Sequence, residues 1–120
     1  GEGWQERHAG LAQGLTAAGR VGFVDVTADW CITCKTNKAL VLDTDTVSKT
    51  FADQGVVLLR ADWTLPDDAI SAYLASFGRY GIPFNAVYGP SAPDGLPLPE
   101  ILTTSAIRDA LQRASGPPLH

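Results

Sequence analysis

Short apolar segments alternate along the chain with segments whose apolar residues recur every three or four positions. Residues 21–28, 56–62 and 84–88 are rich in β-branched and aromatic residues, and the first is apolar on both faces, as in a strand inside a sheet. A Pro/Gly-rich connection, residues 89–97, comes next, and prolines border and interrupt a fourth apolar segment, residues 98–102, which we therefore expect at a sheet edge. The pattern predicts about four strands, with residues 21–28 central.

The amphipathic segments predict helices around these strands. From Trp4 to Ala18 the apolar positions follow helical spacing, with His8 on the same face, which predicts an additional N-terminal helix. Another helix is expected from Cys31 to about Leu42. Three more are expected after caps at residues 44–46, from Pro66, and after a cap at Thr103 or Thr104.

The order α, β, α, α, β, α, β, β, α predicts one α/β domain over residues 1–120. We expect a mixed sheet covered by helices on both faces. Its core would span about residues 21–115, and residues 117–120 would form a tail outside the packed core.

Composition and charge exclude several classes of protein. Thirteen Asp and Glu against nine Lys and Arg give a net charge of −4, without a basic cluster, so we expect no nucleic-acid partner. Apolar runs reach only four residues, far below the roughly 20 needed to span a bilayer, so we expect no membrane insertion of this segment. No signal peptide is visible, so the chain is expected to be either cytosolic or a piece of a longer protein. We expect a monomer.

The two cysteines lie in one four-residue window, Cys31-Ile32-Thr33-Cys34, where a central strand meets a helix. Two cysteines are too few for a disulfide scaffold. At the start of a helix, unpaired N–H groups and the helix dipole stabilise a thiolate, which favours Cys31 as a nucleophile. Cys34, one turn later, could then attack a mixed disulfide formed on Cys31. Such exchange moves two electrons with no cofactor beyond the cysteine pair itself.

The pair has three alternative roles. A closed zinc site needs about four ligands, and the only histidines are His8 and His120. A purely structural disulfide across two residues would close almost no loop and stabilise little. A Cu(I)-binding module is the alternative of a different class, because two thiols suit a soft ion, although the chain has no Met.

The cysteine motif and two distant stretches resemble known proteins. The motif ADWCITCK at residues 28–35, with Asp25 before it and Gly81-Ile82-Pro83 downstream, resembles the thioredoxin superfamily. That motif, residues 42–47, PFNAVYGP at residues 83–90 and LPEILT at residues 98–103 resemble more closely the C-terminal (gamma) thioredoxin-like domain of DsbD-type membrane thiol:disulfide interchange proteins. The last two stretches are similar especially to the ScsB branch, which is linked to copper tolerance.

The resemblance implies a thioredoxin fold and assigns roles to several residues. Cys31 would be the exposed attacking thiol, and Cys34 the buried resolving thiol. Pro83 would be cis and packed against the disulfide, leaving the backbone of Ile82 for strand-like pairing with a partner peptide. Trp30 would shield the disulfide.

Three charged residues are further candidates. Asp25 lies in an apolar strand, where desolvation raises the pKa of a carboxyl group, so it could exchange a proton with Cys34. Arg60 is a candidate partner of Asp25, or else a solvated strand charge. At Lys38 the DsbD-type domains usually have a glutamate, and a cation there would favour thiolates, which leads to the hypothesis of a lower pKa for Cys31; the alternative is that Lys38 points into solvent.

The leading hypothesis is therefore a periplasmic thiol–disulfide oxidoreductase domain of an inner-membrane protein. The resemblance implies that it takes electrons from a transmembrane partner domain and passes them to periplasmic thioredoxin-like proteins through transient mixed disulfides. A free-standing periplasmic reductase, for example in cytochrome c maturation, is the alternative enzyme.

Overall fold

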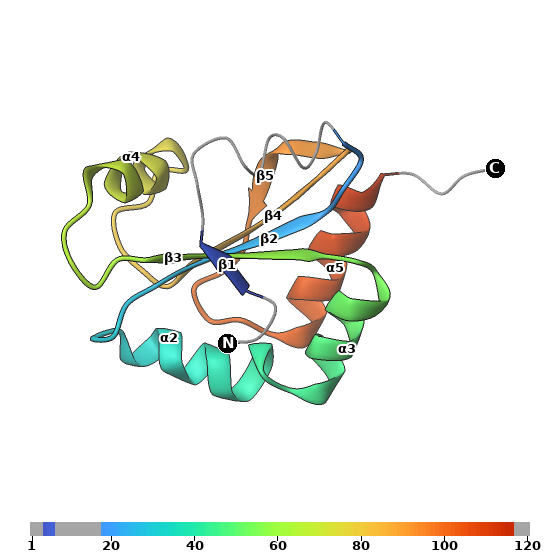
Figure 1. Cartoon of the computed structure of the whole chain (residues 1–120), viewed down its shortest axis with the longest axis horizontal. Helices are drawn as coiled ribbons and strands as arrows, with labels where there is room; N and C mark the ends of the chain where they lie inside the picture. Colours follow the sequence, from blue (N-terminus) through green and yellow to red (C-terminus); the bar gives the residue numbers. More distant parts are fainter. Residues whose placement is uncertain (1–3, 7–17, 117–120) are drawn as a thin grey trace.

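The computed structural model describes residues 4–6 and 18–116, which form a mixed sheet with helices on both faces (Figure 1). The elements in chain order are β1 (Trp4–Glu6), β2 (Gly22–Thr27), α2 (Ile32–Asn37), η1 (Lys38–Leu42), α3 (Asp45–Asp53), β3 (Val57–Asp62), α4 (Asp68–Ser76), β4 (Phe84–Gly89), β5 (Ala92–Pro97) and α5 (Thr104–Ser115).

Strand β2 is central, as predicted. Among the described residues the order of strands in the sheet is β1-β3-β2-β4-β5. Strand β3 pairs with β1 and β2 in parallel, and β4 pairs with β2 and β5 antiparallel. Because β2 has a neighbour on each side and both of its faces are covered, an almost wholly apolar segment can form it.

The two faces of the sheet carry separate apolar cores. One is built around Phe23, Phe51, Val87 and Leu111 and is covered by α3, α5 and the end of η1. The other is built around Val24, Leu59, Leu74 and Phe84 and is covered by α4. Figure 1 accordingly shows α4 on one side of the sheet, and α2, α3 and α5 on the other.

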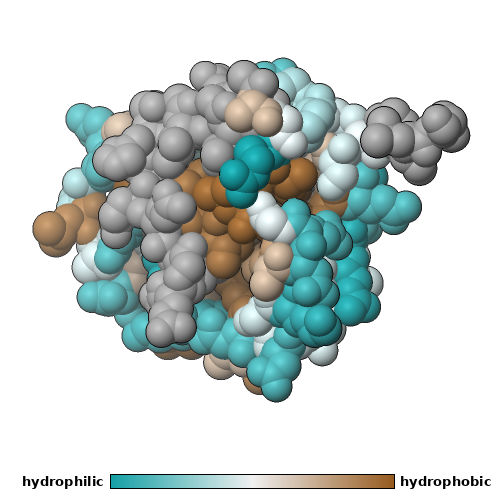
Figure 2. Space-filling view, turned by 45° about the vertical axis from the view of Figure 1, so that its right-hand side comes forward, coloured by the Kyte–Doolittle hydropathy of each residue, from teal (hydrophilic) through white to brown (hydrophobic). Residues whose placement is uncertain are grey.

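Side-chain caps begin α3, α4 and α5. Thr44 accepts from the N–H of Val47, and Thr103 accepts from the N–H of Ala106, both at predicted cap positions. Helix α4 is capped by Asp67, so it begins two residues after Pro66 rather than at that proline. Helices α3 and α5 come forward in Figure 2 and present mainly hydrophilic residues, while hydrophobic residues gather in the middle of that face.

The structure corrects two sequence predictions. Trp4–Glu6 is a strand paired with β3, so the N-terminal helix does not include Trp4; residues 7–17, with His8, and the predicted tail at residues 117–120 lie outside the described residues.

The edge strand is also displaced. It is Ala92–Pro97, inside the expected connection, whereas residues 98–102 are not a strand. Pro97 is tolerated because an edge strand needs backbone donors on one side only. The Leu98 and Leu102 side chains pack instead into the core beside α5, and Ile101 is exposed.

Candidate redox site

Cys31 and Cys34 form a disulfide at the start of α2, with their Cα atoms 5.2 Å apart. Cys31 is the N-cap: its backbone is extended, and its Sγ accepts a hydrogen bond from the N–H of Cys34 at 3.1 Å. The Cys31 N–H donates to the Ala28 carbonyl, which closes the turn between β2 and α2. The sulfur of Cys31 therefore lies where a helix offers an unpaired N–H group to a negative charge.

Both cysteines are 5% exposed, which differs from the expectation that Cys31 is exposed and Cys34 buried. The reason is packing, because Ala28 and Ile82 contact the pair and cover Cys31 as well as Cys34. The two positions differ in their surroundings instead. Cys31 lies between two exposed residues, Trp30 and Ile32, whereas Cys34 lines a pocket that it shares with Asp25.

The Ile82–Pro83 peptide bond is cis, as the resemblance implied. It lies between α4 and β4, and Ile82 packs against the cluster of Ala28, Cys31 and Cys34. The loop that contains Pro83 therefore brings residues about fifty positions downstream to the disulfide. Tyr80, in the same loop, is 83% exposed.

Asp25 lies in the middle of β2, is 6% exposed, and is flanked by residues of both neighbouring strands. Its register partners are Arg60 on β3 and Asn85 on β4. The Asn85 Nδ2 donates to Asp25 Oδ1 at 2.8 Å, and the Arg60 Nε lies 3.8 Å from Asp25 Oδ2. Burial raises the pKa of Asp25, and the Asn85 hydrogen bond and the charges of Arg60 and Lys38 oppose that rise.

A cavity of about 260 Å³ connects Asp25 with helix α2, which carries Cys34. Its lining residues are Asp25, Thr27, Ala28, Asp29, Cys34, Lys35, Lys38, Arg60 and Asp62. The buried acid and the sulfur-bearing residue Cys34 thus line one pocket, which is open to solvent on the side of the charged residues.

Lys38 lines this cavity and also forms an ion pair with Asp43, Nζ to Oδ2 at 2.6 Å. Its side chain is about half exposed, so neither expectation for Lys38 describes it fully: it does not point away from the site, and Asp43 neutralises part of its charge.

Two contacts with the loop after β3 hold the turn before Cys31. The Trp30 indole Nε1 donates to the Thr64 carbonyl at 3.2 Å, and the Asp29 N–H donates to the Thr64 hydroxyl at 2.9 Å. Trp30 also contacts Trp63, with ring centroids 6.4 Å apart. Trp30 remains 57% exposed, and its ring forms part of the outer surface beside the disulfide.

The sequence interpretation missed two buried amides at this site. Asn85 contacts Asp25, and Asn37 joins α2 to the segment after β5 through the Glu100 carbonyl and the Leu102 N–H. The signal for Asn85 was a polar residue inside the apolar run 84–88, on the same strand face as Val87. Asn37 had no such signal, because its partners are more than sixty residues away.

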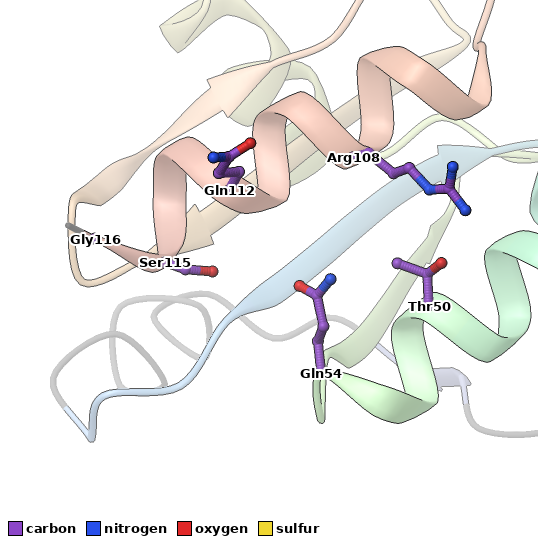
Figure 3. Close-up of a pocket in the computed structure, with 6 residues that line it drawn as sticks. All are labelled: Thr50, Gln54, Arg108, Gln112, Ser115 and Gly116. Carbon is purple, nitrogen blue, oxygen red and sulfur yellow. The ribbon is translucent and has the colours of Figure 1, made fainter. Parts of the chain in front are cut away.

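A second hollow lies between α3 and α5, with a volume of about 450 Å³. Thr50 of α3 and Gln54, directly after that helix, line it opposite Arg108 and Ser115 of α5 (Figure 3). It contains no cysteine and no carboxylate, so it has no part in the redox site.

Neither a metal site nor a membrane span is found in the described ranges. Among residues 4–6 and 18–116, no three His, Cys, Asp or Glu residues are grouped so as to hold a metal ion. None of the helices described combines the length and apolar character needed to cross a bilayer.

Comparisons with known proteins agree with this geometry. The family model for thioredoxin-like proteins matches residues 4–90. The chain is 40% identical over 68 residues to the thiol:disulfide interchange protein DsbD of Ralstonia nicotianae (strain ATCC BAA-1114 / GMI1000), a match that covers 57% of this chain and 11% of that protein.

Two solved structures show the same fold. The C-terminal domain of Neisseria meningitidis DsbD in the oxidised form is 21% identical, with a TM-score of 0.69 over 88% of this chain and 90% of that one. Thioredoxin f from spinach chloroplast is 16% identical, with a TM-score of 0.64 over 94% of each chain. The chain therefore belongs to the thioredoxin-like family, with a thioredoxin fold, and within that family it resembles the C-terminal domain of DsbD.

Proposed function

We propose that this domain reduces protein disulfides by dithiol–disulfide exchange through Cys31 and Cys34, with Asp25 as the proton acceptor for Cys34. The observation that carries the proposal is the pairing of a disulfide at a helix start with a buried carboxyl in the cavity that Cys34 lines. Burial raises the pKa of Asp25, which suits a group that must take up a proton from a thiol and release it again.

The exchange proceeds in two displacement steps. The Cys31 thiolate attacks one sulfur of a partner disulfide; that S–S bond breaks, and the partner's other sulfur leaves as a thiolate and takes a proton from water. The Cys34 thiol then gives its proton to the Asp25 carboxylate and attacks the Cys31 sulfur. The mixed disulfide breaks, the Cys31–Cys34 disulfide forms, and the partner's second sulfur leaves as a thiolate that takes a proton from water, so the partner departs with two thiols. The partner has gained two electrons and the domain has lost two.

The surface around the disulfide supports docking of a partner chain. Trp30, Ile32 and Tyr80 are large apolar residues that are all more than half exposed. The backbone of Ile82, between Tyr80 and Pro83, would pair with the partner peptide in the manner of a strand. Exposed apolar residues around a reactive centre are typical of an interaction surface.

The likeness to DsbD supports a place for this chemistry in a relay. The chain spans 11% of the length of the DsbD relative, so the other parts of such a protein would supply the electrons. In this proposal a transmembrane domain reduces Cys31–Cys34, and the reduced pair passes its electrons to periplasmic thioredoxin-like proteins.

Trapping with Cys34→Ser tests the proposal. Without Cys34 the mixed disulfide on Cys31 cannot be resolved, so a periplasmic extract should yield covalent adducts that a reductant releases. Cys31→Ser is the matched control, because it keeps one thiol in the same motif but removes the attacking sulfur, and it should trap nothing.

Three results would contradict the proposal. Adducts that form equally with Cys31→Ser would refute the assignment of the attacking thiol. Undiminished reduction of a protein disulfide by the Cys31→Ser variant would refute the exchange itself. A complete absence of Cys34→Ser adducts with thioredoxin-like proteins would refute the relay.

A further inference from the structure

Asn85 is a buried amide whose position is explained by Asp25. It lies on β4, 1% exposed, directly opposite Asp25 in the antiparallel pair of β2 and β4. Its Nδ2 donates to Asp25 Oδ1 at 2.8 Å, and the same group lies 3.4 Å from the Val24 carbonyl. The neighbouring residues that face the same way, such as Val87, belong to the apolar core. A polar side chain at this position is costly unless it is hydrogen-bonded.

The two oxygens of the Asp25 carboxyl group have different neighbours. Oδ1 accepts from Asn85, whereas Oδ2 faces the guanidinium of Arg60 at 3.8 Å, longer than a hydrogen bond. Both Asp25 and Arg60 line the cavity that contains Cys34, and Asn85 does not line it. The amide therefore holds the carboxyl group from the side of β4, outside the pocket in which the thiol would exchange its proton.

We propose that Asn85 is a positioning residue for the second step of exchange: its amide fixes Oδ1 of Asp25 and stabilises the carboxylate, so that the acid is ionised and oriented when Cys34 must lose its proton. The inference rests on the proposed role of Asp25 as the proton acceptor. It assigns to this amide a specific part in resolution of the mixed disulfide, beyond packing of the sheet.

Charged groups also face Asp25, and they differ from Asn85 in kind. Those on the surrounding elements are Arg60 and Asp62 of β3, Lys35 of α2, Lys38 of η1 with its partner Asp43, and Asp29 of the turn. Lys38 and Asp43 are each about half exposed, so salt screens their influence. The Asn85 hydrogen bond is buried and short, and it is the largest influence that opposes the rise in the pKa of Asp25 caused by burial.

Removal of the amide has a predictable sign. A hydrogen bond to the carboxylate favours the ionised form, so its loss raises the pKa of Asp25 further. Below that pKa a smaller fraction of molecules has a carboxylate ready to accept the proton. The resolving step should therefore slow on the acid side of its pH profile, and the whole rising limb should move to higher pH.

The experiment uses the reduced protein and Ellman's reagent, a small aromatic disulfide, in stopped flow. Attack by Cys31 releases the first thionitrobenzoate, and attack by Cys34 on the mixed disulfide releases the second. In Asn85→Leu, which has a similar shape but no donor, the second phase should slow by roughly 3- to 10-fold on the acid limb, since hydrogen bonds to charged groups are among the stronger ones. The first phase should be unchanged.

Asp25→Asn and the double variant separate this inference from the proposed function. Asp25→Asn alone should slow the second phase and flatten its pH profile, and addition of Asn85→Leu in that background should change nothing further. If Asp25→Asn leaves the second phase unaltered, the proposed role of Asp25 is wrong. If Asp25→Asn slows it but Asn85→Leu leaves the profile of the otherwise native protein in place, the role of Asp25 stands and that of Asn85 is overturned.

Two further variants guard against a general loss of structure. Val87→Ala removes buried apolar contacts two residues along the same strand face and should lower stability without moving the profile. Asn85→Ala removes the same donor without apolar bulk and should shift the limb in the same direction as Asn85→Leu. An equal shift in Val87→Ala, or an Asn85→Leu effect that persists in the Asp25→Asn background, would reduce Asn85 to a packing role.

Discussion

Asn37 joins helix α2 to the segment after β5, and its substitution tests quantitatively what holds that helix in place. It is 4% exposed; its Nδ2 donates to the Glu100 carbonyl at 2.8 Å, and its Oδ1 accepts from the Leu102 N–H at 3.1 Å. The substitution Asn37→Leu keeps the shape of the side chain and removes both hydrogen bonds. The segment on the far side carries Leu102, which packs into the core beside α5.

The expected loss of stability follows from the burial of the two partners. Glu100 is exposed, so water can replace the lost bond to its carbonyl, and that bond contributes about 0.5 to 1.5 kcal/mol. Leu102 is 3% exposed, so its N–H would be left buried without an acceptor, which costs about 1 to 3 kcal/mol. The sum is about 1.5 to 4.5 kcal/mol, a large part of the roughly 6 to 18 kcal/mol expected for a domain of this size.

Urea unfolding of the oxidised protein measures this loss, and hydrogen exchange of the Leu102 amide locates it. Thr36→Ala is the control on the same helix: Thr36 is exposed and bonds only to the preceding turn, so its loss should change the free energy of unfolding by less than about 0.5 kcal/mol. A change of that small size in Asn37→Leu, with the Leu102 amide still protected from exchange, would refute the reasoning.

Three other changes have definite expected outcomes. Because burial raises the pKa of Asp25 above its ordinary value of 3.8, the contribution of Asp25 to the free energy of unfolding should be greatest below that value and be lost as the pH rises through the folded-state pKa. Urea midpoints measured against pH should therefore change in favour of Asp25→Asn, relative to the native protein, as the pH rises, and parallel profiles would contradict this. Lys38→Glu should raise the pKa of the Cys31 thiol in alkylation rates measured against pH, with Lys38→Gln between the two, and an unchanged or lower value would disprove the effect of the cation. A Cβ at Gly89 would collide with the backbone of Ala114, whereas a Cβ at Gly81 would meet nothing within 4 Å. In thermal melts Gly89→Ala should therefore lose about 1 to 3 kcal/mol of stability, and Gly81→Ala much less. Equal losses would contradict the close approach of α5 to β4.

The parts of the fold that local sequence could predict are those whose burial or capping is local. The strands β2, β3 and β4 are apolar runs that must be buried wherever they lie, and Thr44 and Thr103 cap the helices that directly follow them. The start of a helix at the cysteines is likewise determined by residues next to Cys31 in the sequence. For these elements the nearest few residues contain the deciding interactions.

The sequence predictions that were wrong concern segments whose structure depends on contacts with residues distant in the sequence. Leu98 and Leu102 have the apolar character of a strand, but they bury their side chains against α5 while Ala92–Pro97 pairs with β4. Trp4–Glu6 forms a strand because β3 offers a free edge, which no helical periodicity can reveal. The role of Asn85 depends likewise on the register that places it opposite Asp25.

The buried polar residues of this domain are concentrated around helix α2. Asp25, Asn37 and Asn85 are the buried polar or charged residues among those that the structure describes. Asn37 belongs to the helix, Asp25 shares a cavity with Cys34, and Asn85 bonds to Asp25.

Elsewhere the two cores on the sheet faces are apolar, so the fold itself does not need buried polar groups. Each such group costs desolvation, which its hydrogen bonds offset, so the loss of one partner leaves the other buried and unpaired. Their confinement to one place is consistent with the proposed exchange, in which the Asp25 carboxyl group takes a proton from Cys34 and Asn37 holds helix α2 in position.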